Sequence, residues 1–127
     1  VDIEVTIGQH PLAKAFLDKI AGADILVVSM AENNANYSAA FKNVFDWCSR
    51  IGAKVFQDKP MLLMATSPGA RGGASVLEIA KNAFPRYGAI IKATFSLPSF
   101  NDNFDVEKGK ISNMEFDNQL REIVKGF

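Results

Sequence analysis

Apolar positions follow two different rhythms along the chain. Segments with apolar residues at helical spacing alternate with short runs in which almost every residue is apolar. The helical spacing predicts four helices, over 11–21, 37–51, 74–84 and 112–127. The continuous runs predict three strands, over 25–29, 61–65 and 90–97. Uninterrupted apolar runs are typical of parallel strands that are covered on both faces.

Local signals agree with this division. Ser112 and Glu115 form a capping box at the start of the last helix. The glycine-rich stretch 67–73 cannot continue a strand, and 98–109 is predicted as a loop. Strict alternation of helix and strand predicts an α/β domain with helices on both faces of a parallel sheet. Right-handed crossovers then bring the loops that follow the strands to one edge of that sheet.

Composition narrows the possible functions. A chain of 127 residues, 48% of them hydrophobic, predicts a single domain over 1–127 with its own core. Fourteen basic and fourteen acidic residues leave no net charge to attract nucleic acid or an anionic membrane. No apolar stretch reaches the roughly 20 residues of a membrane span. A single cysteine, Cys48, excludes an internal disulfide. We therefore expect a soluble, cytoplasmic protein that binds neither nucleic acid nor membrane.

Two unusual loops follow the first two predicted strands. The first, 30–37, carries Glu32 and asparagines at three positions. The second, 67–73, contains three glycines, which let backbone N–H groups approach a ligand closely. Both lead into helix N-termini, whose N–H groups favour electronegative atoms. Ligands of open α/β sheets bind at the carboxyl ends of the strands, where these two loops lie. Because the loops offer amide side chains and backbone N–H groups, we expect the ligand to be a planar, acceptor-rich heterocycle.

No catalytic side chain and no metal site are predicted. The chain has no Gly-x-Ser-x-Gly motif, and its only histidine is remote from any serine motif. No histidine or carboxylate cluster has the spacing of metal ligands. Any redox or group-transfer chemistry would therefore come from a cofactor.

For several residues a structural interpretation competes with a functional one. The asparagines of the first loop are also common turn and helix-cap residues. Arg71 is either a ligand for a phosphate or a solvated surface residue. Cys48 lies on the apolar stripe of its helix, which favours a packed core thiol over a nucleophile. Trp47 is either an exposed interface anchor or a residue at the edge of the core, and His10 is expected to be exposed.

Together the two loops resemble those of the NADPH-dependent FMN reductase family, whose fold is flavodoxin-like. Its members carry Pro-Glu-Tyr-Asn-Gly-Ser after the third strand and Leu-Lys-Asn-x-x-Asp-Trp in the next helix. Here 31–36 reads Ala-Glu-Asn-Asn-Ala-Asn, and 41–47 reads Phe-Lys-Asn-Val-Phe-Asp-Trp. The second loop reads Ser-Pro-Gly-Ala-Arg-Gly-Gly, like the family's second flavin loop. The residues that match the first motif in type and spacing are Glu32, Asn34, Lys42, Asn43, Asp46 and Trp47.

The resemblance implies an oxidoreductase with a three-layer α/β/α fold. Hydride would pass from NADH or NADPH through bound FMN to a second acceptor, which is free flavin, a quinone or an azo compound. A homodimer or homotetramer is also implied. The residues implied to contact FMN are Ala31, Glu32, Asn33, Asn34, Ala35, Asn36, Ser67, Pro68, Gly69, Arg71, Gly72 and Gly73.

Three departures from the family pattern define the alternatives. Asn33 stands where the family has tyrosine, and Ala35 stands where it has glycine, which matters if a positive φ is needed. The family's first strand and its Gly-Ser-x-x-x-x-Ser phosphate loop do not precede Ile25. In the family's strand order, 2-1-3-4-5, that strand would lie beside 25–29.

We therefore expect the C-terminal two-thirds of a flavodoxin-like domain, with its N-terminal strands missing. The strand over 25–29 would then have an unpaired edge, and FMN would bind more weakly. The alternative functions are a flavin-binding electron-transfer or redox-responsive module without reductase turnover, and a fragment that binds no flavin.

Overall fold

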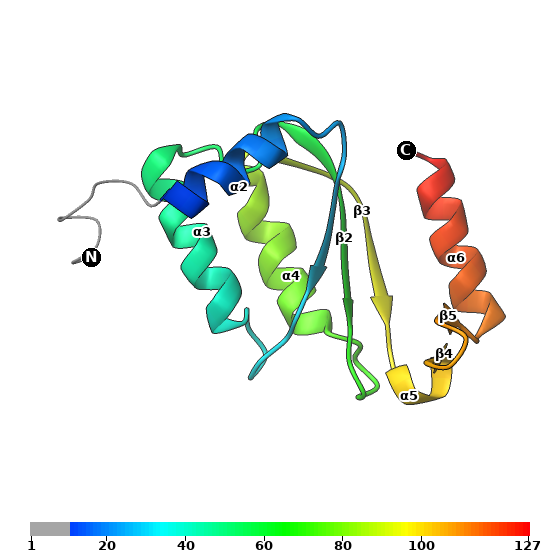
Figure 1. The fold of residues 1–127 in the computed structure, drawn as a ribbon. Coiled ribbons are helices and arrows are strands. Elements are labelled where there is room, and N and C mark those ends of the chain that lie inside the picture. Colours follow the sequence, from blue (N-terminus) through cyan, green and yellow to red (C-terminus); the bar gives the residue numbers. More distant parts are fainter. Residues whose placement is uncertain (1–10) are drawn as a thin grey trace.

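The computed structural model describes residues 11–127 (Figure 1). Its longer elements are α2 (Pro11–Ala21), β1 (Leu26–Met30), α3 (Ala39–Ile51), β2 (Lys59–Thr66), α4 (Ala74–Ala83), β3 (Ala89–Leu97) and α6 (Met114–Lys125). Its short elements are the 3-10 helix η1 (Phe84–Tyr87), α5 (Phe100–Asn103), β4 (Phe104–Asp105) and β5 (Lys110–Ile111). The predicted alternation of helices and strands is confirmed.

The main sheet is parallel and has the order β1-β2-β3. Val27 lies opposite Leu62 in the β1–β2 pair, and Leu63 lies opposite Thr94 in the β2–β3 pair. All three strands run in one direction, so the loops that follow them lie together at the lower edge of Figure 1. Within the described residues β1 pairs only with β2, and Val27 is 63% exposed.

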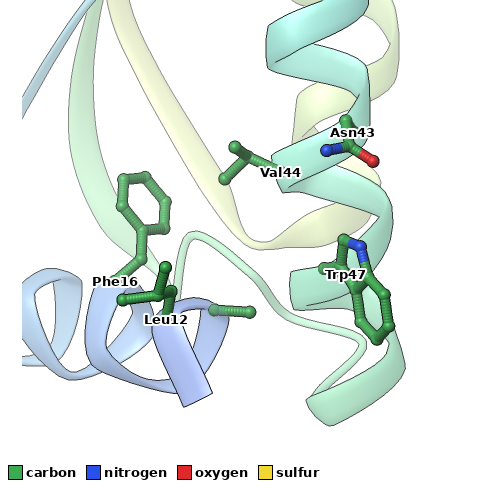
Figure 2. A pocket seen from close by; sticks show the side chains of 6 residues that line it. Leu12, Phe16, Asn43, Val44 and Trp47 are labelled. Atoms are coloured by element: carbon green, nitrogen blue, oxygen red, sulfur yellow. The ribbon is translucent and has the colours of Figure 1, made fainter. Parts of the chain in front are cut away.

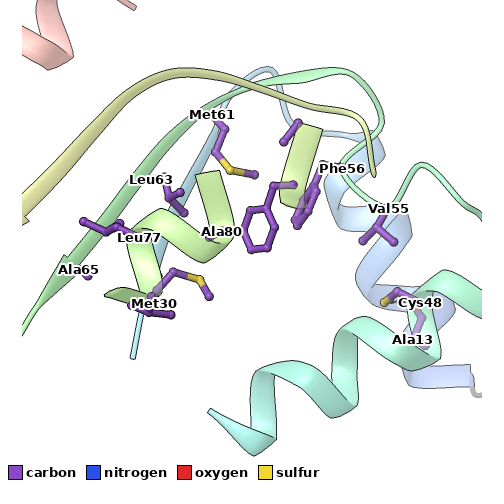
Figure 3. Close-up of a cluster of buried hydrophobic side chains, with 13 residues drawn as sticks. Ala13, Met30, Cys48, Val55, Phe56, Met61, Leu63, Ala65, Leu77 and Ala80 are labelled. Atoms are coloured by element: carbon purple, nitrogen blue, oxygen red, sulfur yellow. Dashed lines mark hydrogen bonds between the residues drawn. The ribbon is translucent and has the colours of Figure 1, made fainter. Parts of the chain in front are cut away.

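Helices cover the sheet from both sides. α2, α3 and α4 lie on one face and α6 lies on the other (Figure 1). Side chains of β2 alternate between the faces, as the pleat of a strand requires. Met61 and Leu63 enter the main core, shown in Figure 3, whereas Leu62 joins a smaller cluster with Phe95. The fold is flavodoxin-like, with the three-layer arrangement that the sequence predicts.

An aromatic cluster attaches α3 to the core. The Phe84 ring packs against Phe41, Phe45 and Tyr37, with ring centroids 5.6, 6.3 and 6.1 Å apart. Such ring pairs contribute about 0.5–1.5 kcal/mol each beyond the apolar area that they bury. Because Tyr37 follows directly on the loop after β1, the cluster also fixes the end of that loop.

Two helices begin later than the spacing predicts. α3 follows Ser38, whose Oγ accepts a hydrogen bond from the amide of Phe41 at 3.1 Å. The capping box expected at Ser112 is wrong, because the side chain of Asn113 caps α6 and accepts from the Glu115 amide at 3.0 Å. Asparagine and serine are comparable N-caps, so a serine at position 112 does not prevent its neighbour Asn113 from capping the helix.

The segment 98–109 is more regular than the predicted loop. It contains α5 and β4, and β4 pairs with β5 in an antiparallel ladder. The side chain of Asn103 donates to the carbonyl of Pro98 at 2.8 Å, and the carbonyl of Asn103 accepts from the amide of Ser112 at 2.8 Å. Elements this short carry no hydrophobic period, so the pattern of the sequence did not reveal them.

Cys48 is a core thiol, as predicted. It is fully buried, and its Sγ lies 3.8 Å from the carbonyl oxygen of Ala13. Burial raises the pKa of the thiol, which disfavours the reactive thiolate. His10 lies outside the described residues, so its exposure stays a prediction. Among residues 11–127 no helix is long and apolar enough to cross a membrane.

Candidate functional site

The loop after β1 closes into a tight turn. The amide of Asn33 donates to the carbonyl of Asn36 at 2.9 Å, and the amide of Asn36 donates back at 3.1 Å. Asn34 and Ala35, between them, have φ values of +51° and +63°, as in a type I′ turn. An alanine therefore occupies the left-handed position where the family has glycine, at a cost of roughly 1–2 kcal/mol. We call residues 33–36 the asparagine hairpin.

The side chains of the asparagine hairpin are exposed and do not cap α3. Ser38 provides that cap, so the alternative that the asparagines cap the helix is wrong. Asn36 Oδ1 accepts from the amide of Tyr37 at 2.7 Å. The carboxamides of Asn33 and Asn34 have no hydrogen-bond partner within the part of the chain that the structure describes. Two amide groups are thus left for a ligand.

Glu32 has a partner that the sequence did not predict. Its Oε1 accepts a hydrogen bond from the backbone N–H of Val76 at 2.7 Å. Val76 lies in the first turn of α4, and Gly73, the N-cap of that helix, has no side chain to offer. The carboxylate of Glu32 therefore caps a helix 44 residues further along the chain. Neither residue carries a local signal that pairs it with the other.

The loop after β2, residues 67–73, is called the glycine loop. Gly72 and Gly73 are buried and have φ values of +59° and +78°. A Cβ at Gly72 would lie 2.8 Å from the nitrogen of Pro98, and one at Gly73 would lie 2.6 Å from the Cβ of Ala65. Protein atoms therefore occupy the space that these glycines leave. Gly69 differs, because it is exposed.

The segment after β3 supports the glycine loop. The hydroxyl of Ser96 donates to the carbonyl of Gly72 at 2.8 Å. The amide of Ser99 donates to the carbonyl of Gly69 at 2.8 Å, and the amide of Phe100 donates to that of Ser67 at 2.9 Å. Sequence reasoning missed this supporting segment. The only available signal was its position after the third strand, at the same edge of the sheet.

The outer part of the glycine loop presents backbone donors. The amides of Gly69, Ala70 and Arg71 donate to no acceptor within residues 11–127. The guanidinium of Arg71 is exposed and donates to the hydroxyl of Ser75 at 3.1 Å. A row of free amides in front of a helix N-terminus favours electronegative ligand atoms.

The second half of the family motif lies on α3. Lys42 and Asp46 form an exposed pair at 2.7 Å, and this hydrogen bond raises the pKa of Lys42. Asn43 and Trp47 line a pocket of about 300 Å³ between α3 and α2, opposite Phe16 (Figure 2). Trp47 is partly buried and packs at the edge of the main core, which confirms the structural alternative for this residue. Trp47 thus contributes to the packing of α3, whereas Lys42, Asn43 and Asp46 are exposed on its surface.

Comparisons with known proteins decide the family. Residues 1–102 match the NADPH-dependent FMN reductase family. The chain belongs to this family. It is 35% identical over 109 residues to an NADPH:quinone oxidoreductase of Arabidopsis thaliana, covering 84% of this chain and 55% of that protein. It is 30% identical over 128 residues to a probable NADPH:quinone oxidoreductase 1 of Oryza sativa subsp. japonica, covering 98% and 62%.

A solved structure agrees with the fold. FerB of Paracoccus denitrificans, a flavoenzyme NAD(P)H:(acceptor) oxidoreductase, superposes with a TM-score of 0.76 at 22% identity. The match covers 98% of this chain and 69% of FerB. The chain therefore spans little more than half to about two thirds of the length of these relatives.

The donor set of the two loops fits a flavin ring. Such a ring is planar and offers carbonyl oxygens and ring nitrogens as acceptors at its pyrimidine end, which suits the free amides of 69–71. The asparagine hairpin adds carboxamides that both donate and accept hydrogen bonds. No group of three or more potential metal ligands lies among the described residues.

Proposed function

We propose that this protein is an NAD(P)H-dependent FMN oxidoreductase that passes hydride from a nicotinamide nucleotide through bound FMN to a second acceptor. One observation carries the proposal: two loops at the carboxyl edge of the sheet are joined by Glu32 and leave unpaired amide groups exposed. Family membership supports the same function. The names of the plant relatives favour a quinone over free flavin or an azo compound as the acceptor.

The residues of the chain would act by binding and orientation. The carboxamides of Asn33 and Asn34 would hold one side of the flavin, and the amides of 69–71 would hold its pyrimidine end. FMN, when bound, supplies reversible two-electron redox chemistry that no side chain of this site offers. Fixed N–H donors stabilise negative charge on a ligand, because they need no reorganisation when the charge develops.

We further propose that the protein is cytoplasmic and works as a homodimer or homotetramer. The family resemblance supports association. An apolar pocket of about 270 Å³ beside β1, lined by Phe16, Val27 and Val44 among others, lies at the edge where the family's first strand would pack, so it does not bear on association. Sedimentation at several concentrations tests this point, and a mass equal to one chain throughout would contradict it.

Flavin binding by the purified chain is the direct test. Titration with FMN and with lumiflavin, which has the ring but neither ribityl chain nor phosphate, would be followed by flavin fluorescence. Because the two loops offer donors for the ring, we expect both flavins to bind with affinities within about tenfold, or 1.4 kcal/mol. If the chain binds neither FMN nor lumiflavin, the proposal is wrong.

Turnover is then tested with NADH or NADPH, FMN and benzoquinone. We expect oxidation of the nucleotide that depends on both the chain and FMN. Flavin binding without turnover would instead support the electron-transfer or redox-responsive module. Glu78→Ala, which alters an exposed residue on α4 outside both loops, is the matched control and should leave binding and turnover unchanged.

A further inference from the structure

α4 begins beside the proposed flavin site without a cap of its own. Its N-cap, Gly73, has no side chain, and its first turn contains no acidic residue. The first N–H groups of a helix lack partners within the helix, and an uncapped end is destabilising. The stability of this helix end therefore depends on an acceptor from elsewhere in the chain.

Glu32 supplies that acceptor. Its Oε1 lies 2.7 Å from the nitrogen of Val76, the third residue of α4. Val76 is fully buried, and Glu32 is partly buried. A carboxylate at a helix N-terminus forms a charge-assisted hydrogen bond and interacts favourably with the helix dipole. Glu32 is thus bonded to α4 before any ligand arrives.

The position of Glu32 in the chain gives this bond a second consequence. Glu32 immediately precedes the asparagine hairpin, which its two internal hydrogen bonds make rigid. Val76 follows closely on the glycine loop, which is tied to the end of β3. The bond between Glu32 and Val76 therefore links two locally rigid units from different parts of the chain.

We propose that Glu32 is a positioning residue that sets the separation between the asparagine hairpin and the glycine loop. The consequence for flavin binding rests on the proposed function, whereas the link itself does not. In this role Glu32 acts on the flavin through Val76 and α4. The family resemblance had implied direct contact between this residue and FMN, and the two roles make different predictions.

Three substitutions of Glu32 separate the effects of side-chain length, charge and hydrogen bonding. Glu32→Ala removes the acceptor. Glu32→Asp keeps the charge but shortens the side chain by one methylene, so that the carboxylate no longer reaches Val76. Glu32→Gln keeps an oxygen at the same reach without the charge. Glu78→Ala is the control, because it removes an exposed carboxylate from the same helix.

Two measurements are made on each variant. Amide hydrogen exchange at Val76 in the flavin-free chain reports the link itself. Flavin titration, with visible circular dichroism of the bound ring, reports the geometry of the site. For Glu32→Ala and Glu32→Asp we expect exchange at Val76 to rise about tenfold or more and flavin affinity to fall about tenfold. In Glu32→Gln the exchange rate at Val76 and the flavin affinity should both stay within about threefold of the natural chain, because the amide oxygen still accepts the hydrogen bond.

The contrary outcomes are distinct. If flavin affinity falls in Glu32→Ala while exchange at Val76 stays unchanged, Glu32 contacts the ligand and the proposal is wrong. If exchange rises while affinity and the dichroism of the bound ring stay unchanged, the link does not set the spacing, and the proposal is again wrong. If the natural chain binds no flavin, the proposed function fails, and exchange at Val76 still decides whether the link exists.

Discussion

The two loops of the site are built in opposite ways. The glycine loop is part of the fold, since Gly72 and Gly73 are buried and the segment after β3 donates hydrogen bonds to its carbonyls. The asparagine hairpin is exposed, and its backbone is closed by its own hydrogen bonds. The glycine loop offers backbone amides whose positions are fixed by the core. The asparagine hairpin offers side chains that can change without disturbing the core. Substitutions in the glycine loop should therefore lower stability, and substitutions in the asparagine hairpin should weaken ligand binding.

The largest expected effect is on the glycine loop. Gly72→Ala places a Cβ against the hydroxyl of Ser96 and 2.8 Å from the nitrogen of Pro98, at a φ of +59°. Overpacking costs about 1–3 kcal/mol and a left-handed alanine about 1–2 kcal/mol, so we expect a loss of roughly 2–5 kcal/mol in the free energy of unfolding. Urea denaturation monitored by circular dichroism measures it.

Gly69→Ala is the matched control within the same loop. A Cβ there would come no closer than 3.8 Å, to the hydroxyl of Ser67, and the position does not have a positive φ. Its effect should stay within about 0.5 kcal/mol. Equal losses at Gly69 and Gly72 would show that the buried glycines have no special packing role.

An intermediate effect is expected at Ser96. Its hydroxyl donates to the carbonyl of Gly72 at 2.8 Å and lies 3.4 Å from that of Arg71. Ser96→Ala leaves a carbonyl in a buried setting without its partner and should cost about 1–2 kcal/mol of unfolding free energy. Ser112→Ala, at an exposed serine that does not cap α6, is the control and should change little. A loss below the error of the measurement at Ser96 would mean that the segment after β3 does not hold the loop.

These contrasts also show how far the sequence alone could lead. The helices, the strands and the shared edge of the two loops were predictable, because burial imposes a period on apolar residues. The bond from Glu32 to Val76 was not, since no pattern in a single chain marks a partner 44 residues away. The reason for a glycine at position 72 could not be predicted either. A glycine leaves space, and only the packed structure shows whether protein or ligand fills that space.

Within the asparagine hairpin, Ala35→Gly should stabilise the protein. Ala35 has a φ of +63°, which glycine adopts without steric cost. The gain is reduced by the greater entropy of glycine in the unfolded chain, so we expect about 0.5–1 kcal/mol in unfolding free energy. Asn34→Gly, at a φ of +51°, should gain less, because asparagine tolerates left-handed backbone better than alanine does. A loss of stability in Ala35→Gly would show that the turn is not of this type.

The smallest effect on stability is expected at Asn33, and there the comparison between the loops is tested most directly. Its side chain is exposed and has no hydrogen-bond partner among residues 11–127, so Asn33→Ala should change the unfolding free energy by less than about 0.5 kcal/mol. The same change removes one carboxamide from the proposed flavin site and should weaken flavin binding several-fold, by about 1 kcal/mol. Asn118→Ala, at an exposed asparagine on α6, is the matched control for both measurements. If Asn33→Ala lowers stability but leaves flavin affinity unchanged, Asn33 has a structural role. The proposed difference between a glycine loop that determines stability and an asparagine hairpin that determines ligand binding would then be wrong.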